Sequence, residues 1–206
     1  MIALRIGWPL KKKRSFPALC LEGPRVLLRP PISGDFESWA RVRGQSRDHL
    51  IPFEPEWRQD SLSKAFFQHR ISHQAREWAL GLTCSFLIIC KNDGDVIGGI
   101  NINNICRGAA QFASLGYWLG QEHQGQGYMY ESGELILAYA FGHLKLHRLN
   151  AATLAHNGRS IKFLRRLGFE EEGFAKSYMR IQGTWQDHIL FGLPHESYDE
   201  RLNLMA

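Results

Sequence analysis

The chain has 206 residues, 44% of them hydrophobic, with a formal net charge of +5 and four cysteines. This length and composition favour one globular domain with a full core and exclude a disordered protein. No apolar run approaches the roughly 18 residues of a membrane-spanning helix, and no Cys-x-x-Cys pair indicates a zinc or redox site.

The positive charge lies at the N-terminus, because residues 1–14 hold five basic residues and no acidic one. In a secretory signal the charges precede the apolar segment, whereas here they follow it, so we expect a cytoplasmic protein. We predict a basic, partly ordered tail over residues 1–22 and a folded domain over residues 23–206. The tail is either a solvated terminus or a weak contact for RNA phosphates or anionic lipid.

The first part of the domain predicts one strand and two helices. Residues 25–29 have the composition of a short strand, and residues 33–35 offer N-cap side chains to the helix that follows. Residues 51–57 contain two prolines and predict an irregular loop. Asp60 or Ser61 is expected to cap the second helix.

From residue 82 onward the pattern favours strands, with two further helices among them. The predicted strands are 82–90, 96–102, 112–119, 148–154, 169–174 and 188–193, and the predicted helices are 128–144 and 157–167. A hairpin turn is expected at residues 92–94. This order of elements indicates an α/β or α+β protein with a single mixed sheet.

The loop between residues 119 and 128 joins a strand to a helix and contains Gly125 and Gly127. Amides at a helix N-terminus have no partner within the helix, and the helix dipole adds positive potential there, so such a site can bind phosphate. Glycines let an anion approach the backbone closely. The loop is neither a Walker loop nor a Gly-x-Gly-x-x-Gly fingerprint, because residue 130 is Tyr. Taken alone, it is either a phosphate site or an ordinary tight turn.

The second motif is Asn157-Gly-Arg-Ser160 at the start of the helix 157–167. Asn157 is a favourable N-cap, and Gly168 is a favourable residue to end the helix. These features are compatible with a purely structural role.

Together, these motifs resemble the Gcn5-related N-acetyltransferases, abbreviated GNAT, and within them the ribosomal-protein N-acetyltransferases of the RimJ/RimL type. The resemblance covers residues 26–193, and residues 50–57 resemble the RimJ subgroup. It rests on Gly116-Tyr-Trp-Leu119, Gln124-Gly-Gln-Gly-Tyr128, Glu131, Asn157-x-x-Ser160, Leu167-Gly-Phe169, Glu172-Gly173 and Gly183-x-x-x-Asp187. The resemblance implies the GNAT fold: a mixed, mostly antiparallel sheet of about seven strands with helices on both faces. The parallel strands 112–119 and 148–154 are then expected to splay apart.

The resemblance also implies a reaction in which a primary amine attacks the thioester of acetyl-CoA directly, without an acyl-enzyme or a metal. No cysteine lies beside a histidine in a motif typical of a nucleophile. A backbone N–H near Trp118 or Leu119 would polarise the thioester carbonyl. The implied acetyl-CoA-binding residues are Tyr117, Trp118, Leu119, Gln124, Gly125, Gln126, Gly127, Tyr128, Met129, Asn157 and Ser160.

Ser160 occupies the position that RimL-like enzymes use to protonate the departing thiolate. The general base is less certain from the sequence, because Met179 or a neighbour occupies the position of the family's glutamate. Glu54 and Glu131 are the remaining candidates. Each has a structural alternative, an exposed surface position for Glu54 and a hydrogen bond or ion pair for Glu131. Asp187 beside His188 is more typical of a strand-end contact than of a catalytic dyad.

A RimJ-like enzyme would acetylate the N-terminal α-amine of a protein, an alanine of a ribosomal protein. The basic tail would then suit weak contact with ribosomal RNA. Two alternatives stay open: an acetyltransferase for a small free amine, such as an amino-acid analogue, a polyamine or an aminoglycoside, and a non-catalytic acyl-CoA-binding protein. Monomer and homodimer are equally compatible with the sequence.

Overall fold

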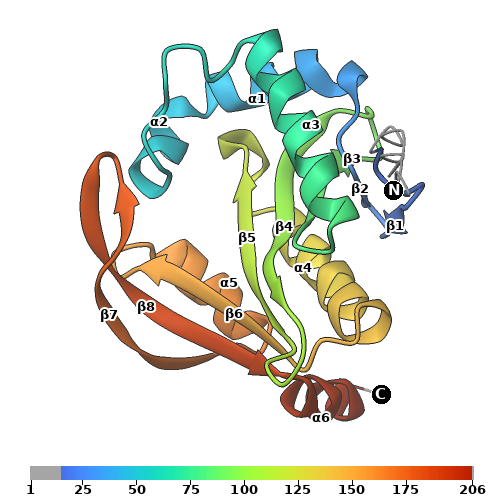
Figure 1. The fold of residues 1–206 in the computed structure, drawn as a ribbon, viewed down its shortest axis with the longest axis vertical. Coiled ribbons are helices and arrows are strands. Elements are labelled where there is room, and N and C mark those ends of the chain that lie inside the picture. The colour runs from blue at the N-terminus through green and yellow to red at the C-terminus, as the bar shows by residue number, and fades with distance from the viewer. Residues whose placement is uncertain (1–14, 206) are drawn as a thin grey trace, which may run out of the picture.

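The computed structural model describes residues 15–205, so the basic residues 1–14 lie outside the described part of the chain (Figure 1). The strands form one eight-stranded sheet in the order β1-β2-β3-β4-β5-β6-β8-β7, and every pair is antiparallel except β5 with β6. The strands are β1 (Leu21–Glu22), β2 (Val26–Arg29), β3 (Cys84–Cys90), β4 (Val96–Cys106), β5 (Phe112–Leu119), β6 (Arg148–Leu154), β7 (Glu170–Ile181) and β8 (Thr184–Pro194). The mixed, mostly antiparallel sheet is confirmed, with β1 pairing with β2 at its edge.

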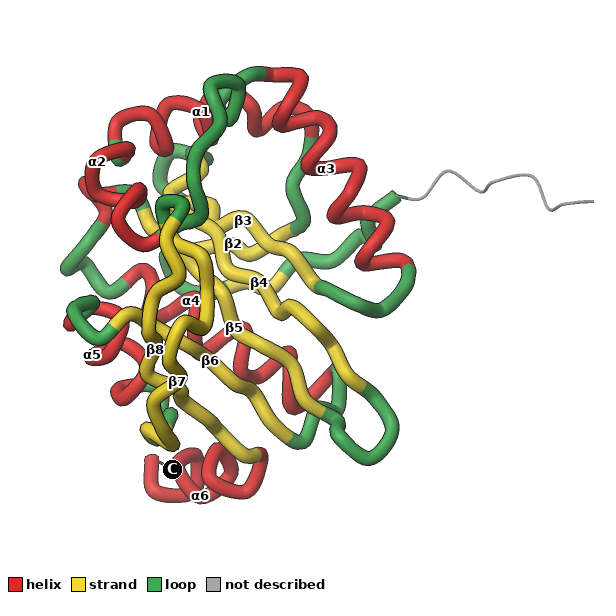
Figure 2. The backbone as a smooth tube through the Cα atoms, turned by 60° about the vertical axis from the view of Figure 1, so that its left-hand side comes forward, coloured by secondary structure: helices red, strands yellow, loops and turns green. Residues whose placement is uncertain are grey.

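Helices cover both faces of the sheet (Figure 2). They are α1 (Phe36–Gln45), α2 (Arg47–Leu50), α3 (Lys64–Ala79), α4 (Tyr128–Ala138), α5 (Gly158–Arg166) and α6 (His195–Met205). Short 3-10 turns add η1 (Ser33–Asp35), η2 (Ile51–Phe53) and η3 (Gln121–His123), and the π-helix η4 (Tyr139–His143) continues α4.

Alternation along the buried strands divides the interior into two cores. Every residue of β3 is buried, with Phe86 and Ile88 in the larger core and Leu87 and Ile89 in the smaller one. The larger core includes residues of α4 and α5, and the smaller core includes residues of α1 and α3. Because successive side chains of a strand point to opposite faces, β3 needs apolar residues at every position.

Several element boundaries differ from the sequence-based predictions. The N-cap of α3 is Ser63, whose hydroxyl accepts a hydrogen bond from the Phe66 amide at 3.1 Å, so the expected caps Asp60 and Ser61 were wrong. The predicted helix 128–144 changes to a π-helix at Tyr139. β7 and β8 extend well beyond the predicted strands. The sequence pattern did not predict the extra length, because most side chains of β7 are exposed and show no apolar alternation. The pattern also gave no indication of α6.

The splay of the parallel pair is confirmed. β5 pairs with β6 at three positions, Phe112 with Arg148, Ala113 with Leu149 and Ser114 with Asn150, and no further along either strand. Figure 1 shows the two strands starting together and then diverging. Residues 115–119 therefore have β4 on one side and an opening on the other.

Candidate active site

The loop before α4 presents unpaired backbone amides. Gly125 and Gly127 have φ values of +72° and +85°, which strain any residue other than glycine. Within residues 15–205, the amides of residues 125–130 donate no hydrogen bond. A row of free N–H groups at the positive end of a helix dipole is suited to bind an anion such as a pyrophosphate.

Arg25, which precedes β2 and lies about 100 residues before the loop in the sequence, contacts the loop directly. Its guanidinium donates from Nη1 to the Gln126 carbonyl at 2.8 Å and lies 5.0 Å from the centre of the Tyr128 ring. A Cβ atom on Gly127 would come within 3.1 Å of Arg25 Nη2. Sequence analysis missed Arg25, because only the tertiary fold brings β2 against this loop.

Glu131 connects α4 to β2. Its Oε1 accepts from the amides of Arg25 at 2.7 Å and Val26 at 3.0 Å, and its Oε2 pairs with Arg25 Nε at 2.9 Å. Burial raises the pKa of the Glu131 carboxyl, but these hydrogen bonds lower it more, so its pKa lies below the usual value. A lowered pKa weakens a general base. The geometry therefore favours the structural alternative over the expected catalytic role.

Tyr117 of β5 and Ser160 of α5 meet across the splay, with their hydroxyl oxygens 2.5 Å apart. Asn157 Oδ1 caps α5 by accepting from the Ser160 amide at 3.1 Å, and its side-chain amide nitrogen has no hydrogen bond within residues 15–205. Burial raises the pKa of Tyr117 far above its ordinary value, although the hydrogen bond with Ser160 lowers it slightly. The phenol therefore stays protonated at neutral pH.

Gln124 links the loop to two helices. Its Oε1 accepts from Arg159 Nη1 of α5 at 2.6 Å, and its side chain also contacts His49 of α2. Burial and the nearby Arg159 lower the pKa of His49, so this imidazole is neutral near pH 7. Leu119 and Met129, two other residues expected at the cofactor site, are half-buried against the larger core.

On the opposite face of β5, Trp118 lies next to a half-buried ion pair. Arg43 stacks between Trp118 and Trp57, with its guanidinium carbon 4.8 Å and 4.5 Å from the two ring centres. Arg43 also donates from Nη2 to Glu54 Oε2 at 2.5 Å and from Nη1 to Oε1 at 3.2 Å, and the Trp57 indole donates to Oε2 at 2.7 Å. Three donors thus occupy the carboxylate of Glu54. The expected role as a general base is disfavoured, and Glu54 instead fixes the loop over residues 51–57.

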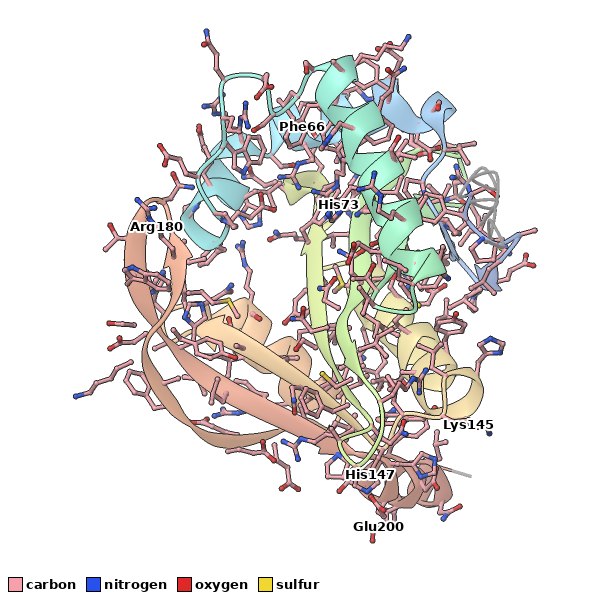
Figure 3. The ribbon with its side chains drawn as sticks, in the orientation of Figure 1. Phe66, His73, Lys145, His147, Arg180 and Glu200 are labelled. Carbon is pink, nitrogen blue, oxygen red and sulfur yellow. The ribbon has the colours of Figure 1, made fainter. Side chains whose placement is uncertain are left out.

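The tip of the β7–β8 hairpin contacts that loop. Gln182 donates two hydrogen bonds to the Glu54 carbonyl, from its backbone N–H at 3.4 Å and from its side-chain Nε2 at 3.2 Å. Figure 3 shows Arg180, near the tip, beside α2. Met179, expected at the position of the family's glutamate, is exposed, as are Tyr178 and Trp185.

Asp187 and His188 do not form a dyad. Asp187 Oδ1 accepts from the Ser177 amide at 2.8 Å, and His188 Nδ1 contacts the Gln186 carbonyl at 3.0 Å. Glu171 and Glu172 of β7 pair with Arg165 and Arg148. Across residues 15–205, no group of three or more His, Cys, Asp or Glu side chains could hold a metal ion. No helix in the same range is long and apolar enough to cross a membrane.

Comparisons with known proteins agree with this geometry. Residues 25–170 match the family model described as an acetyltransferase (GNAT) domain. The chain is 32% identical over 183 residues to the [ribosomal protein uS5]-alanine N-acetyltransferase of Escherichia coli (strain K12), which covers 88% of this chain and 93% of the relative. The ribosomal-protein-S5-alanine acetyltransferase of Vibrio fischeri superposes with a TM-score of 0.81 at 30% identity, covering 87% of this chain and 98% of the other. Mycobacterium smegmatis RimJ in complex with CoA-disulfide superposes with a TM-score of 0.80 at 29% identity, covering 87% and 88%.

Proposed function

The chain belongs to the GNAT family of acetyltransferases, and on this premise we propose that it acetylates the N-terminal alanine of a ribosomal protein. It is an acyltransferase, and its acetyl donor is acetyl-CoA. The similarity to a uS5-alanine N-acetyltransferase over 88% of the chain supports the choice of acceptor. A ribosomal acceptor would locate the reaction in the cytoplasm. Residues 23–206 would form the catalytic domain.

The free amides of residues 125–130, next to the opening between β5 and β6, are the observation that carries the donor half of the proposal. The pyrophosphate of acetyl-CoA would accept from these amides, and Arg25 would hold the loop in the required conformation. Pantetheine would lie in the opening, where Asn157 can donate from its free amide nitrogen. A backbone N–H near Trp118 or Leu119 would then polarise the thioester carbonyl.

The Tyr117–Ser160 contact supports the assignment of Ser160 as the acid. Because burial keeps Tyr117 protonated, its hydroxyl can donate to Ser160 Oγ and leave the Ser160 proton free to point at the departing sulfur. The amine nitrogen bonds to the acetyl carbon, the carbon–sulfur bond breaks, and the sulfur takes the Ser160 proton. The proton lost by the amine returns to Ser160 through water.

The carboxylates of Glu54 and Glu131 are both occupied, so we assign them positioning roles. An N-terminal amine has a pKa of about 7.7–8.0, so part of it is already neutral near pH 7. Water can therefore accept the proton that the neutral amine loses as its nitrogen bonds to the acetyl carbon, and the site needs no carboxylate base.

The test is to incubate the protein with isotopically labelled acetyl-CoA and a mixture of ribosomal proteins, and to map acetylated N-termini by mass spectrometry. We expect label on the α-amine of an N-terminal alanine, and an initial rate about 100-fold lower with the Ser160→Ala variant. Rapid acetylation of free amines such as polyamines or aminoglycosides, with no labelled protein, would overturn the proposed acceptor. Tight binding of acetyl-CoA without acetylation of either pool would instead indicate a non-catalytic protein.

A further inference from the structure

Arg70 of α3 faces a small pocket against the sheet. The pocket is lined by side chains of α3, β3, β4 and β5, among them Gln74, Ser85, Asn101 and Trp118. Figure 3 shows His73, one turn further along α3, where this helix passes the sheet. The free volume of the pocket, about 10 Å³, admits one water-sized group. A ligand could therefore place one carboxylate oxygen in the pocket, while its other atoms stay outside beside the half-buried Arg70.

The Arg70 guanidinium has no partner within residues 15–205, where it forms neither a hydrogen bond nor an ion pair. Burial and then the charge of Arg43 lower the pKa of Arg70, while Glu54 opposes this effect. Glu54 cannot neutralise Arg70, because its oxygens already accept from Arg43 and Trp57. Arg70 is half-buried, so its unpaired guanidinium remains accessible to an anion from outside.

The rest of the pocket offers hydrogen bonds but no negative charge. Gln74, Ser85 and Asn101 make no side-chain hydrogen bond within the described residues. Their polar atoms therefore remain available to a ligand. The combination of one unpaired cation with neutral polar groups is complementary to a small anion.

The pocket lies on the face of β5 opposite Ser160. Trp118 pairs with Gly99 and Asn101 pairs with Gly116, so both lie beside the end of β5 that has lost β6 as a neighbour. Along β5, Tyr117 packs with the larger core and Trp118 with the smaller one, so Ser160 and Arg70 are on opposite faces. An amine that approaches the thioester from the side opposite Ser160 brings its nearest substituents toward Arg70.

We propose that Arg70 determines acceptor specificity by binding a carboxylate that the acceptor carries close to its reactive amine. The planar guanidinium matches a carboxylate in a bidentate pair, and Gln74 or Asn101 donates a further hydrogen bond. The carboxylate has two sources: an acidic side chain near the N-terminus of a protein, or the α-carboxylate of a free amino acid. This inference rests on the proposed acetylation of an amine from this face, and it distinguishes the two acceptor classes.

The experiment uses short peptides that begin with alanine and carry Glu or Gln at the second, third or fourth position. A parallel arm uses free amino acids and their C-terminal amides. Initial rates at saturating acetyl-CoA are measured with the natural protein, Arg70→Gln and Arg70→Lys. Arg76→Gln is the matched control, because Arg76 is an exposed residue of the same helix outside the pocket.

We expect Arg70→Gln to lower kcat/KM for the preferred acidic acceptor by about 10- to 100-fold, the range of one charge-assisted hydrogen-bond pair. The neutral acceptor and the KM for acetyl-CoA should change less than about threefold. Arg70→Lys should recover part of the activity, because a lysine keeps the charge but loses the bidentate geometry. Arg76→Gln should behave as the natural protein does.

Equal rates for acidic and neutral acceptors with the natural protein would overturn the inference, and so would equal losses on both in Arg70→Gln. In either case, if the peptides are still acetylated, the proposed function is not contradicted. If free amino acids react in an Arg70-dependent manner and peptides do not, the inference holds and the ribosomal acceptor fails. Calorimetric binding of N-acetylated acidic and neutral peptides to the CoA-loaded protein tests Arg70 without turnover. If the acidic and neutral peptides bind with equal affinity, both to the natural protein and to Arg70→Gln, the inference is rejected.

Discussion

Residues 120–131, which form the loop and first turn of α4, offer mainly backbone groups, whereas the opposite side of β5 offers side chains. The loop presents the unpaired amides of residues 125–130. The face of β5 that carries Trp118 presents Arg43, Glu54 and Arg70, which come from three separate segments of the chain. A backbone site depends on conformation and is recognised by its glycines, but a side-chain site depends on packing between distant segments.

The largest expected effect is the loss of acetyl-CoA binding at the loop before α4, produced by Gly127→Val. Residue 127 has a φ of +85°, and an added Cβ would meet Arg25 at 3.1 Å. Backbone strain and lost hydrogen bonds to phosphate together amount to about 4 kcal/mol, or about 1,000-fold in kcat/KM for acetyl-CoA. Steady-state kinetics measures this loss. The control is Gly34→Ala, at a position with free space around the added Cβ and a φ that is not positive. An unchanged KM would show that the loop does not hold the pyrophosphate.

Ser160→Ala should have the next largest effect and separates chemistry from donor binding. General acids contribute about 10²- to 10⁴-fold. Because a thiolate with a pKa near 8.5 is a good leaving group, we expect the lower end, about 100-fold in kcat. The Kd for acetyl-CoA, measured by titration calorimetry, should change less than about threefold. Full turnover in this variant would exclude Ser160 as the acid. Tyr117→Phe should produce a smaller loss, because it removes only the hydroxyl that orients Ser160.

Glu131→Gln tests whether the carboxylate beside the loop is structural. We expect the free energy of unfolding to fall by about 1–3 kcal/mol at pH 7 while most of kcat remains. The folded-state pKa of Glu131 is lowered, so its stabilisation is complete above the ordinary value of 4.5 and is lost as the pH falls through the folded-state pKa. Denaturant unfolding of both proteins should therefore give a difference that shrinks at acidic pH. A loss of kcat at unchanged stability would restore Glu131 as a candidate base.

The smallest expected effect concerns residues 1–14, which lie outside the described part of the chain. Their deletion removes five positive charges. We expect ribosome co-sedimentation to weaken by a few-fold at low salt and to be unaffected at high salt, because counterion release scales with the number of phosphate contacts. The rate on a free peptide should be unchanged. Identical sedimentation of the full and shortened chains at low salt would remove RNA contact as a role for the tail.

Local sequence was sufficient to predict the elements whose pattern is strong. β5 and β6 match the predicted bounds 112–119 and 148–154. The same reasoning failed for α3, where a Ser63 cap replaced Asp60 or Ser61, and for β7, whose exposed residues carry no alternation. Strand pairing and helix caps that depend on tertiary neighbours leave little local trace.

Arg43 shows how a functional contact could have been suspected. It lies four residues after Trp39 on one face of α1, and an arginine on an apolar helical face often stacks on aromatic rings. Its pairing with Glu54 could not be predicted in the same way, because Glu54 lies between Pro52 and Pro55 in a segment without a regular pattern. Arg25 and Arg70 had no local signal of any kind.

The amino-acid sequence by itself determined the loop before α4, since Gly125, Gly127 and the helix that follows them are contiguous and specify a backbone conformation. It also determined the class of donor through the motifs that resemble the GNAT family. Only the tertiary structure showed which cations pair with the carboxylates of Glu131 and Glu54, namely Arg25 and Arg43. It also showed that Arg70 forms no ion pair within residues 15–205. The physical reason is that a hydrogen bond or ion pair between distant segments depends on how the sheet packs them, and a carboxylate's role depends on which donors reach it.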